Sequence, residues 1–147
     1  DSMNVDFKIA TLDDVEEIVD LCNECFNENT SYEYAKASFR KTLFDDNQIY
    51  INGYMDRVLV AHVKVTIIPT MYEGMEKYAI LNHVCVKPEY RRHNIATHML
   101  DFVTQVAKSR NCIALELWSK NFREAAHACY KNYGFEVIDA KFFSKSI

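Results

Sequence analysis

The chain has 147 residues, of which 49% are hydrophobic and 26% are charged. These values are typical of one globular domain with a single core, and they exclude intrinsically disordered, collagen-like and coiled-coil classes. The formal net charge of −4 argues against a nucleic-acid partner, because neutralising phosphates requires a basic surface.

No apolar run approaches the roughly 18 to 20 residues of a membrane span, and the first residues lack the basic and apolar segments of a secretory signal. We therefore expect a cytoplasmic protein with no membrane partner. Asp1 and Ser2 precede Met3 and are interpreted as a remnant of cloning, and residues 1–147 as one domain. The five cysteines include only one CxxC pair, so we expect reduced thiols and no metal.

The periodicity of apolar residues predicts the elements in chain order. Residues 5–10 alternate as a strand does, and Thr11 followed by two aspartates marks a helix start. Residues 32–43 predict a second helix, and residues 49–53 and 58–68 predict two strands. In the second of these strands His62, Lys64 and Thr66 form a polar face, which we expect to meet solvent or a site.

The second half of the chain alternates strands with helices. Strands are predicted over residues 78–86 and 113–118, helices over 95–108 and 123–133, and a last strand or hairpin over 135–144. The expected order is β α α β β β α β α β, which gives an α/β (α+β) domain with helices around a mixed sheet.

A basic connector, Arg91, Arg92 and His93, directly precedes the helix expected from Ile95. Free backbone N–H groups at a helix N-terminus bind anions, and two guanidinium groups add to the attraction. A diphosphate is a suitable guest, and the alternative is a solvated basic loop. The glycine patterns of a P-loop and of a dinucleotide fingerprint are both missing, so nucleotide hydrolysis is not indicated.

The segment RRHNIA at 91–96, the segment NFREAAHACYKNYGF at 121–135 and the opening KIATLDD at 8–14 together resemble the GNAT superfamily of acyl-CoA-dependent N-acetyltransferases. In that family an [R/Q]xxGx[G/A] loop holds the coenzyme A pyrophosphate. The resemblance covers essentially the whole chain and implies a single-domain GNAT fold, a mainly antiparallel sheet, and acetyl-CoA as co-substrate. Asn94 stands where the family has glycine, and asparagine tolerates the left-handed backbone region better than most residues.

Three further details resemble bacterial aminoalkylphosphonate N-acetyltransferases and their small-amine relatives. They are Asn94 itself, the Ala126-His127 pair before Tyr130, and the ending FFSK at 142–145.

The resemblance implies two groups of functional residues. Those expected to bind acetyl-CoA are Val84, Val86, Arg91, Arg92, His93, Asn94, Ile95, Ala96, Thr97, Asn121 and Tyr130. Val84 and Val86 would act through their backbones, as an added strand does. Tyr130 matches the tyrosine that protonates the coenzyme sulfur, and the alternative is an aromatic core residue.

The sequence offers three alternatives for the general base that removes the amine proton. Many relatives carry a carboxylate on the strand before the pyrophosphate loop, where this chain has Asn82 and His83. Histidine titrates near neutrality and accepts an amine proton directly or through water. Glu116 is the carboxylate alternative, and water with no protein base is a third.

We therefore expect an enzyme that transfers acetyl from acetyl-CoA to a primary amine of a small molecule, by direct attack in a ternary complex. The alternatives are a protein or peptide N-acetyltransferase and a catalytically inert acyl-CoA-binding sensor. Dimerisation is common in the resembled family, so a homodimer is compatible with this interpretation.

Overall fold

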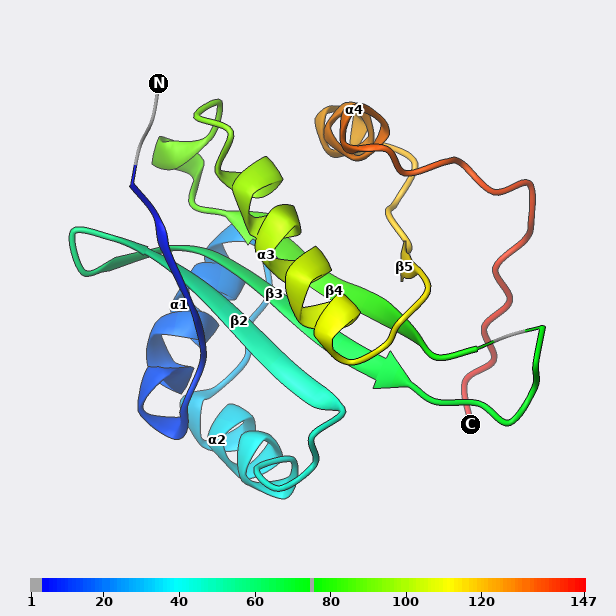
Figure 1. Ribbon diagram of the computed structural model, residues 1–147. Coiled ribbons are helices and arrows are strands. Elements are labelled where there is room, and N and C mark those ends of the chain that lie inside the picture. The colour runs from blue at the N-terminus through cyan, green and yellow to red at the C-terminus, as the bar shows by residue number, and fades with distance from the viewer. Residues whose placement is uncertain (1–3, 75) are drawn as a thin grey trace.

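The computed structural model describes residues 4–74 and 76–147, and the segment interpreted as a cloning remnant lies outside them. A five-stranded sheet with strand order β1-β2-β3-β4-β5 forms the centre of the fold (Figure 1). The elements in chain order are β1 (Asp6–Ile9), a 3₁₀ helix (Leu12–Asp14), α1 (Val15–Phe26), α2 (Tyr32–Lys41), β2 (Gln48–Met55), β3 (Val58–Ile68), β4 (Tyr78–Val86), a second 3₁₀ helix (Pro88–Tyr90), α3 (Ile95–Ser109), β5 (Leu115–Leu117) and α4 (Glu124–Tyr133). The predicted order is confirmed up to α4.

The sheet is mixed and mainly antiparallel, as expected. Strands β1 to β4 pair antiparallel with their neighbours, and β5 pairs parallel to β4. Strands β2 and β3 are joined by a tight hairpin in which Asp56 and Arg57 both have positive φ, the geometry that matches the twist of the flanking strands. Strands β4 and β5 are connected through α3, which is the crossover that a parallel pair requires.

Helices cover both faces of the sheet. The apolar stripe of α3, which includes Ile95, Met99 and Val103, packs on β2, β3 and β4 in the main core. On the opposite face, Ile18, Leu21 and Cys22 of α1 pack with the neighbouring strands. Figure 1 shows α3 in front of the sheet and α1 and α2 behind it. Because helices cover both faces of the sheet, a ligand can reach the end of β4 only along an uncovered edge of the strand.

The polar face of β3 lies partly inside the protein. His62 is only 2% exposed, and its Nδ1 lies 2.8 Å from Oδ1 of the buried Asn52. Burial lowers the pKa of His62 to about 3, so this imidazole is neutral and Nδ1 donates to the amide oxygen. His62 therefore does not meet solvent, whereas Lys64 and Thr66 on the same face are half-buried.

The last strand, expected over residues 135–144, is absent from the described structure. Residues 135–147 contain no regular element, and Figure 1 shows them as an irregular trace running from α4 to the C-terminus. The apolar residues fall in adjacent pairs, Val137 with Ile138 and Phe142 with Phe143, so no single face of a strand would be apolar. The neighbouring edge strand β5 also offers only three residues for pairing.

No helix in residues 4–74 and 76–147 combines the length and apolar character that crossing a bilayer requires. The five cysteines are all free thiols.

Candidate active site

The central feature of the site is a β-bulge in β4. Lys64 of β3 faces Asn82, whereas His62 faces Cys85, so one residue of β3 is opposed by two residues of β4. His83 takes up the extra length in the left-handed region with φ 53°. A bulge re-aims the side chain at its position, and histidine tolerates this backbone region better than bulky or branched residues.

The bulge directs His83 toward the C-terminal end of α1. Its Nε2 lies 2.9 Å from Oε2 of Glu28, and its ring contacts Phe26 edge-on with 4.8 Å between ring centroids. Because a carboxylate only accepts, the Nε2–H of His83 donates to Glu28. This tautomer leaves Nδ1 of His83 as the nitrogen that can accept a proton.

Glu28 is held by a structured loop. Helix α1 ends at Asn27, which adopts the left-handed conformation with φ 52°. The Asn23 side chain then binds the loop at both backbone groups of Thr30, through Nδ2 to the carbonyl at 3.1 Å and through Oδ1 to the N–H at 3.0 Å. The position of Glu28 against His83 is therefore fixed by the helix end rather than by a flexible segment.

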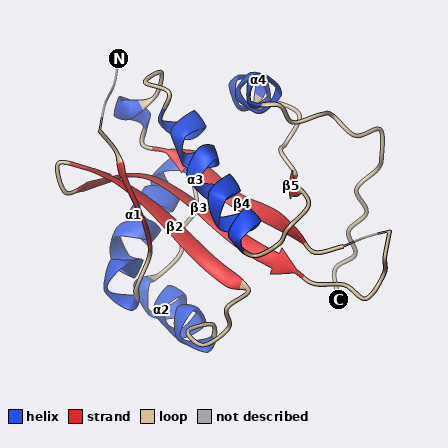
Figure 2. Ribbon diagram, in the orientation of Figure 1, coloured by secondary structure: helices blue, strands red, loops and turns tan. Residues whose placement is uncertain are grey.

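Beyond the bulge, one edge of β4 is unpaired with β5. The pairing of β4 with β5 extends only from Ala79–Leu115 to Leu81–Leu117, and Figure 2 shows how short β5 is beside β4. The N–H of Lys87 donates to the Val60 carbonyl at 2.7 Å, so Lys87 and Cys85 present their peptide groups to β3. By alternation Val84 and Val86 present theirs to the unpaired edge.

The N-terminus of α3 lies just after this edge. Asn94 caps the helix in the left-handed region with φ 61°, and Arg92 has φ 68°. The first intrahelical bond joins the N–H of His98 to the carbonyl of Asn94. The N–H groups of residues 95–97 therefore have no acceptor within the helix, and within the described chain no side chain caps them.

The basic residues of this loop have different positions. Arg91 folds back, so that its Nε donates to the Val86 carbonyl at 3.0 Å and its Nη2 lies 3.9 Å from Sγ of Cys25. Arg92 is exposed to solvent and His93 is half-buried. Arg91 is thus engaged by the chain itself, while Arg92 is the guanidinium free to meet an anion from solvent.

Tyr130 approaches the same region from α4. Its ring packs against the α3 side of the core and contacts Phe135 with 5.8 Å between centroids. Burial, with a further contribution from Cys129, raises the pKa of Tyr130 to about 12. Tyr130 therefore keeps its proton at neutral pH and can donate it. Tyr133 instead bonds Asp101 at 2.8 Å and Thr104 at 3.0 Å, as a packing residue does.

Arg123, at the start of α4, connects the two sides of the sheet. Its guanidinium lies 5.3 Å from the ring centroid of Phe26 on α1 and 5.0 Å from that of Phe122. These cation–π distances place the start of α4 against the end of α1. Arg123, Phe26 and Glu28 were not singled out from the sequence, because their shared location depends on contacts between distant segments.

The structure brings together most of the residues expected from the sequence. Residues 91–97 form one loop and helix start, next to the unpaired backbone of Val84 and Val86. Glu116 sits on β5 opposite Ile80, whereas His83 contacts the α1 end. Asn121 is exposed in the turn before α4. No group of metal-ligating side chains occurs among the described residues.

Comparisons with known proteins agree with this geometry. Residues 13–135 match the acetyltransferase (GNAT) family. A transcriptional regulator from Bacillus halodurans has a similar structure with a TM-score of 0.88 and 19% identity, covering 98% of this chain and 100% of that one.

Two solved acetyltransferases are also similar. An acetyltransferase with acetyl-CoA from Clostridium acetobutylicum has a TM-score of 0.79 and 19% identity, covering 97% of this chain and 96% of its own. An aminoglycoside 6'-N-acetyltransferase from Acinetobacter baumannii has a TM-score of 0.80 and 20% identity, covering 98% and 99%. These likenesses show the fold, and the family match covers most of the chain. The chain therefore belongs to the GNAT acetyltransferase family and is an acetyl-CoA-dependent acyltransferase.

Proposed function

We propose that this acetyltransferase acetylates a primary amine of a small molecule by direct attack in a ternary complex. The observations that support the proposal are the pairing of His83 with Glu28 beyond the last pair of β4 with β5, and the protonated Tyr130 that packs on the core from α4. His83 can remove a proton from an amine, and Tyr130 can supply a proton to the leaving thiolate. These are the proton transfers that the reaction needs.

The residues present fit the coenzyme. The amides at the start of α3 and the exposed Arg92 suit its pyrophosphate, because a helix N-terminus and a guanidinium both favour phosphate oxygens. The peptide groups of Val84 and the N–H of Val86 suit the amides of the pantetheine arm, which would add to β4 as an extra strand, while the Val86 carbonyl already accepts from Arg91. Asn121 and His93 are retained as neighbours of the coenzyme in this proposal.

The proposed reaction begins with an amine that arrives protonated. Neutral His83 takes the proton at Nδ1, directly or through water, while the Glu28 carboxylate holds Nε2–H and stabilises the resulting imidazolium. The amine nitrogen then attacks the acetyl carbonyl carbon, and a backbone N–H of the β4 edge stabilises the oxygen as it becomes negative. The carbon–sulfur bond breaks as the Tyr130 hydroxyl donates its proton to the sulfur. The nitrogen then loses its second proton, which returns through water to the Tyr130 oxygen and leaves a neutral amide.

The small-molecule acceptor is supported by the fold and by the acidic character of the chain. One similar structure is an aminoglycoside 6'-N-acetyltransferase, and a net charge of −4 attracts cationic amines. Aminoalkylphosphonates, suggested by the sequence likeness, are a second amine class. Both belong in the test.

An amine panel tests the function itself. Release of free coenzyme A thiol from acetyl-CoA should be measured with aminoglycosides, aminoalkylphosphonates, simple alkylamines, an N-terminal peptide and a lysine peptide. We expect saturable turnover with at least one small amine and background rates with the peptides. Turnover with peptides alone would establish the protein acetyltransferase instead, and acetyl-CoA binding without any turnover would establish an inert sensor.

Asn94 tests the phosphate loop. Asn94→Gly should leave acetyl-CoA affinity unchanged or improve it, whereas Asn94→Val should weaken affinity by roughly tenfold, since a β-branched residue is strained at φ 61°. Asn111→Val is a matched control, because Asn111 has φ 64° beyond the other end of α3. It should cost stability without changing the calorimetric Kd. Equal affinities of the wild type, Asn94→Gly and Asn94→Val would remove the loop from the binding site.

His83 and Glu28 test the base. His83→Ala should lower kcat/KM for the amine mainly on the acidic side of the pH profile, by roughly 10²-fold, because there acceptor deprotonation limits the rate. Glu28→Gln keeps the shape but not the charge, and we expect a smaller loss in the same pH range. Glu116→Gln should leave the profile unchanged. The assignment fails if Glu116→Gln alone reproduces the acidic-side loss.

Tyr130 tests the acid. Tyr130→Phe removes one hydroxyl, so we expect kcat at saturating substrates to fall by roughly 10²-fold while acetyl-CoA affinity changes little. Tyr133→Phe loses hydrogen bonds to Asp101 and Thr104, so it should lower the free energy of unfolding by about 1 kcal/mol and preserve kcat. A Tyr130→Phe kcat within about twofold of wild type, well under 1 kcal/mol of barrier, would return Tyr130 to a packing role.

A further inference from the structure

Three thiols gather where α1 packs on the end of β4. Cys22 and Cys25 lie one helical turn apart on α1, and Cys85 lies on β4 two residues after the bulged His83. Cys22 and Cys85 are buried in the same cluster, and Cys25 packs against it. The arrangement is a cluster of nucleophilic groups that the acetyl-transfer proposal does not use.

The three thiols differ in access to solvent. Cys22 is 8% exposed and Cys85 is 6% exposed, whereas Cys25 is only half-buried. A small oxidant therefore reaches Cys25 first. Reaction at the other two sulfurs requires either local opening or transfer from Cys25.

The surroundings of Cys25 favour its anionic form. Nη2 of Arg91 lies 3.9 Å from its Sγ and favours the thiolate, whereas the protonated thiol donates to the Val86 carbonyl at 3.6 Å. The hydrogen bond from Cys85 and the charge of Arg91 outweigh burial and lower the pKa of Cys25 to about 7. Hydrogen bonds to the neighbouring thiols and burial raise the pKa of Cys85 and keep it protonated. One thiolate thus faces one thiol.

We propose that Cys25 is a site of oxidative modification, at which a peroxide forms a sulfenic acid that Cys85 then converts into a disulfide between α1 and β4. The first step forms a sulfur–oxygen bond as the Cys25 thiolate attacks the peroxide, whose oxygen–oxygen bond breaks and releases hydroxide. In the second step the Cys85 sulfur attacks the Cys25 sulfur, and the hydroxyl leaves as water with the Cys85 proton. Overall two thiols lose two electrons and hydrogen peroxide is reduced to water.

Cys85 is assigned as the resolving thiol because it lies on β4 in the buried cluster against which Cys25 packs. The disulfide would fasten the end of α1 to the strand segment that continues into the Arg91 loop. The proposal concerns the resting protein, so it holds or fails independently of which amine is acetylated.

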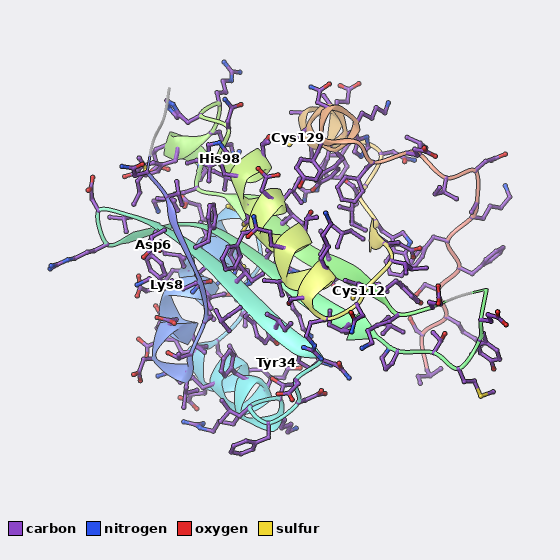
Figure 3. The ribbon with its side chains drawn as sticks, in the orientation of Figure 1. Asp6, Lys8, Tyr34, His98, Cys112 and Cys129 are labelled. Atoms are coloured by element: carbon purple, nitrogen blue, oxygen red, sulfur yellow. The ribbon has the colours of Figure 1, made fainter. Side chains whose placement is uncertain are left out.

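The test is peptide mapping of the intact, folded chain after hydrogen peroxide treatment, with free thiols blocked under denaturing conditions. We expect one disulfide, between Cys25 and Cys85. Cys25→Ser should abolish it, while Cys112→Ser and Cys129→Ser should retain it. Those two control thiols are also half-buried, and Figure 3 shows Cys129 on α4 and Cys112 just beyond α3, away from α1.

Two further measurements test the proposal, and the second needs no replacement of the buried Cys85. A 1,3-dione probe should trap the sulfenic acid at Cys25 in Cys85→Ser. In the wild type, iodoacetamide should alkylate Cys25 with a pH midpoint near 7, below that of an ordinary thiol. A disulfide between Cys22 and Cys25 would overturn the role of Cys85. Equal labelling of Cys25, Cys112 and Cys129 by iodoacetamide, or no disulfide at all, would overturn the assignment of Cys25 as the site of oxidation.

Discussion

The site depends on one extra residue in β4. Because two residues of β4 oppose one of β3 after Asn82, the side-chain alternation changes phase within the strand. Before the bulge, Ala79 and Leu81 face the α3 core, and after it Val84 faces that core while Cys85 faces α1. In a regular strand Val84 would face α1 and Cys85 would face α3. His83 would then point into the core under α3. The left-handed conformation of His83 is therefore what gives this strand both a packed core and a polar group at the end of α1.

The same region explains why a substrate arm can approach the sheet. Strand β5 follows β4 only as far as Leu81, so the peptide groups beyond that point face an open edge. An open edge normally invites pairing with another chain, and proteins usually cover or charge it. Here the loop before α3 partly covers it, since Arg91 bonds the Val86 carbonyl. In the proposed reaction the coenzyme takes the remaining donors, so the edge is used for binding rather than left as a liability.

The sequence predicted what depends on local patterns. Apolar periodicity placed α1, α3 and β3, and the residues before Ile95 indicated an anion site at a helix start. The positive φ of Asn94 agrees with the argument that asparagine replaces glycine there. The pairing of His83 with Glu28 was beyond reach, because the two residues are 55 positions apart and meet only through a bulge that no periodicity encodes. The strand expected over residues 135–144 failed for a different reason: its residues have strand propensity, but their adjacent apolar pairs do not match the period of a sheet.

The geometry also separates the two proposed proton transfers. His83 contacts Phe26 and Glu28 on the α1 side of β4, whereas Tyr130 packs with the core on the α3 side. On opposite sides, the acid and the base each reach their own proton without hydrogen-bonding each other. Strand β4 separates these two sides, and Arg123 at the start of α4 stacks on Phe26 of α1. The amine can then lose its proton to His83 on one side while the sulfur gains a proton from Tyr130 on the other. Acetyl transfer therefore does not wait for a proton to pass between His83 and Tyr130.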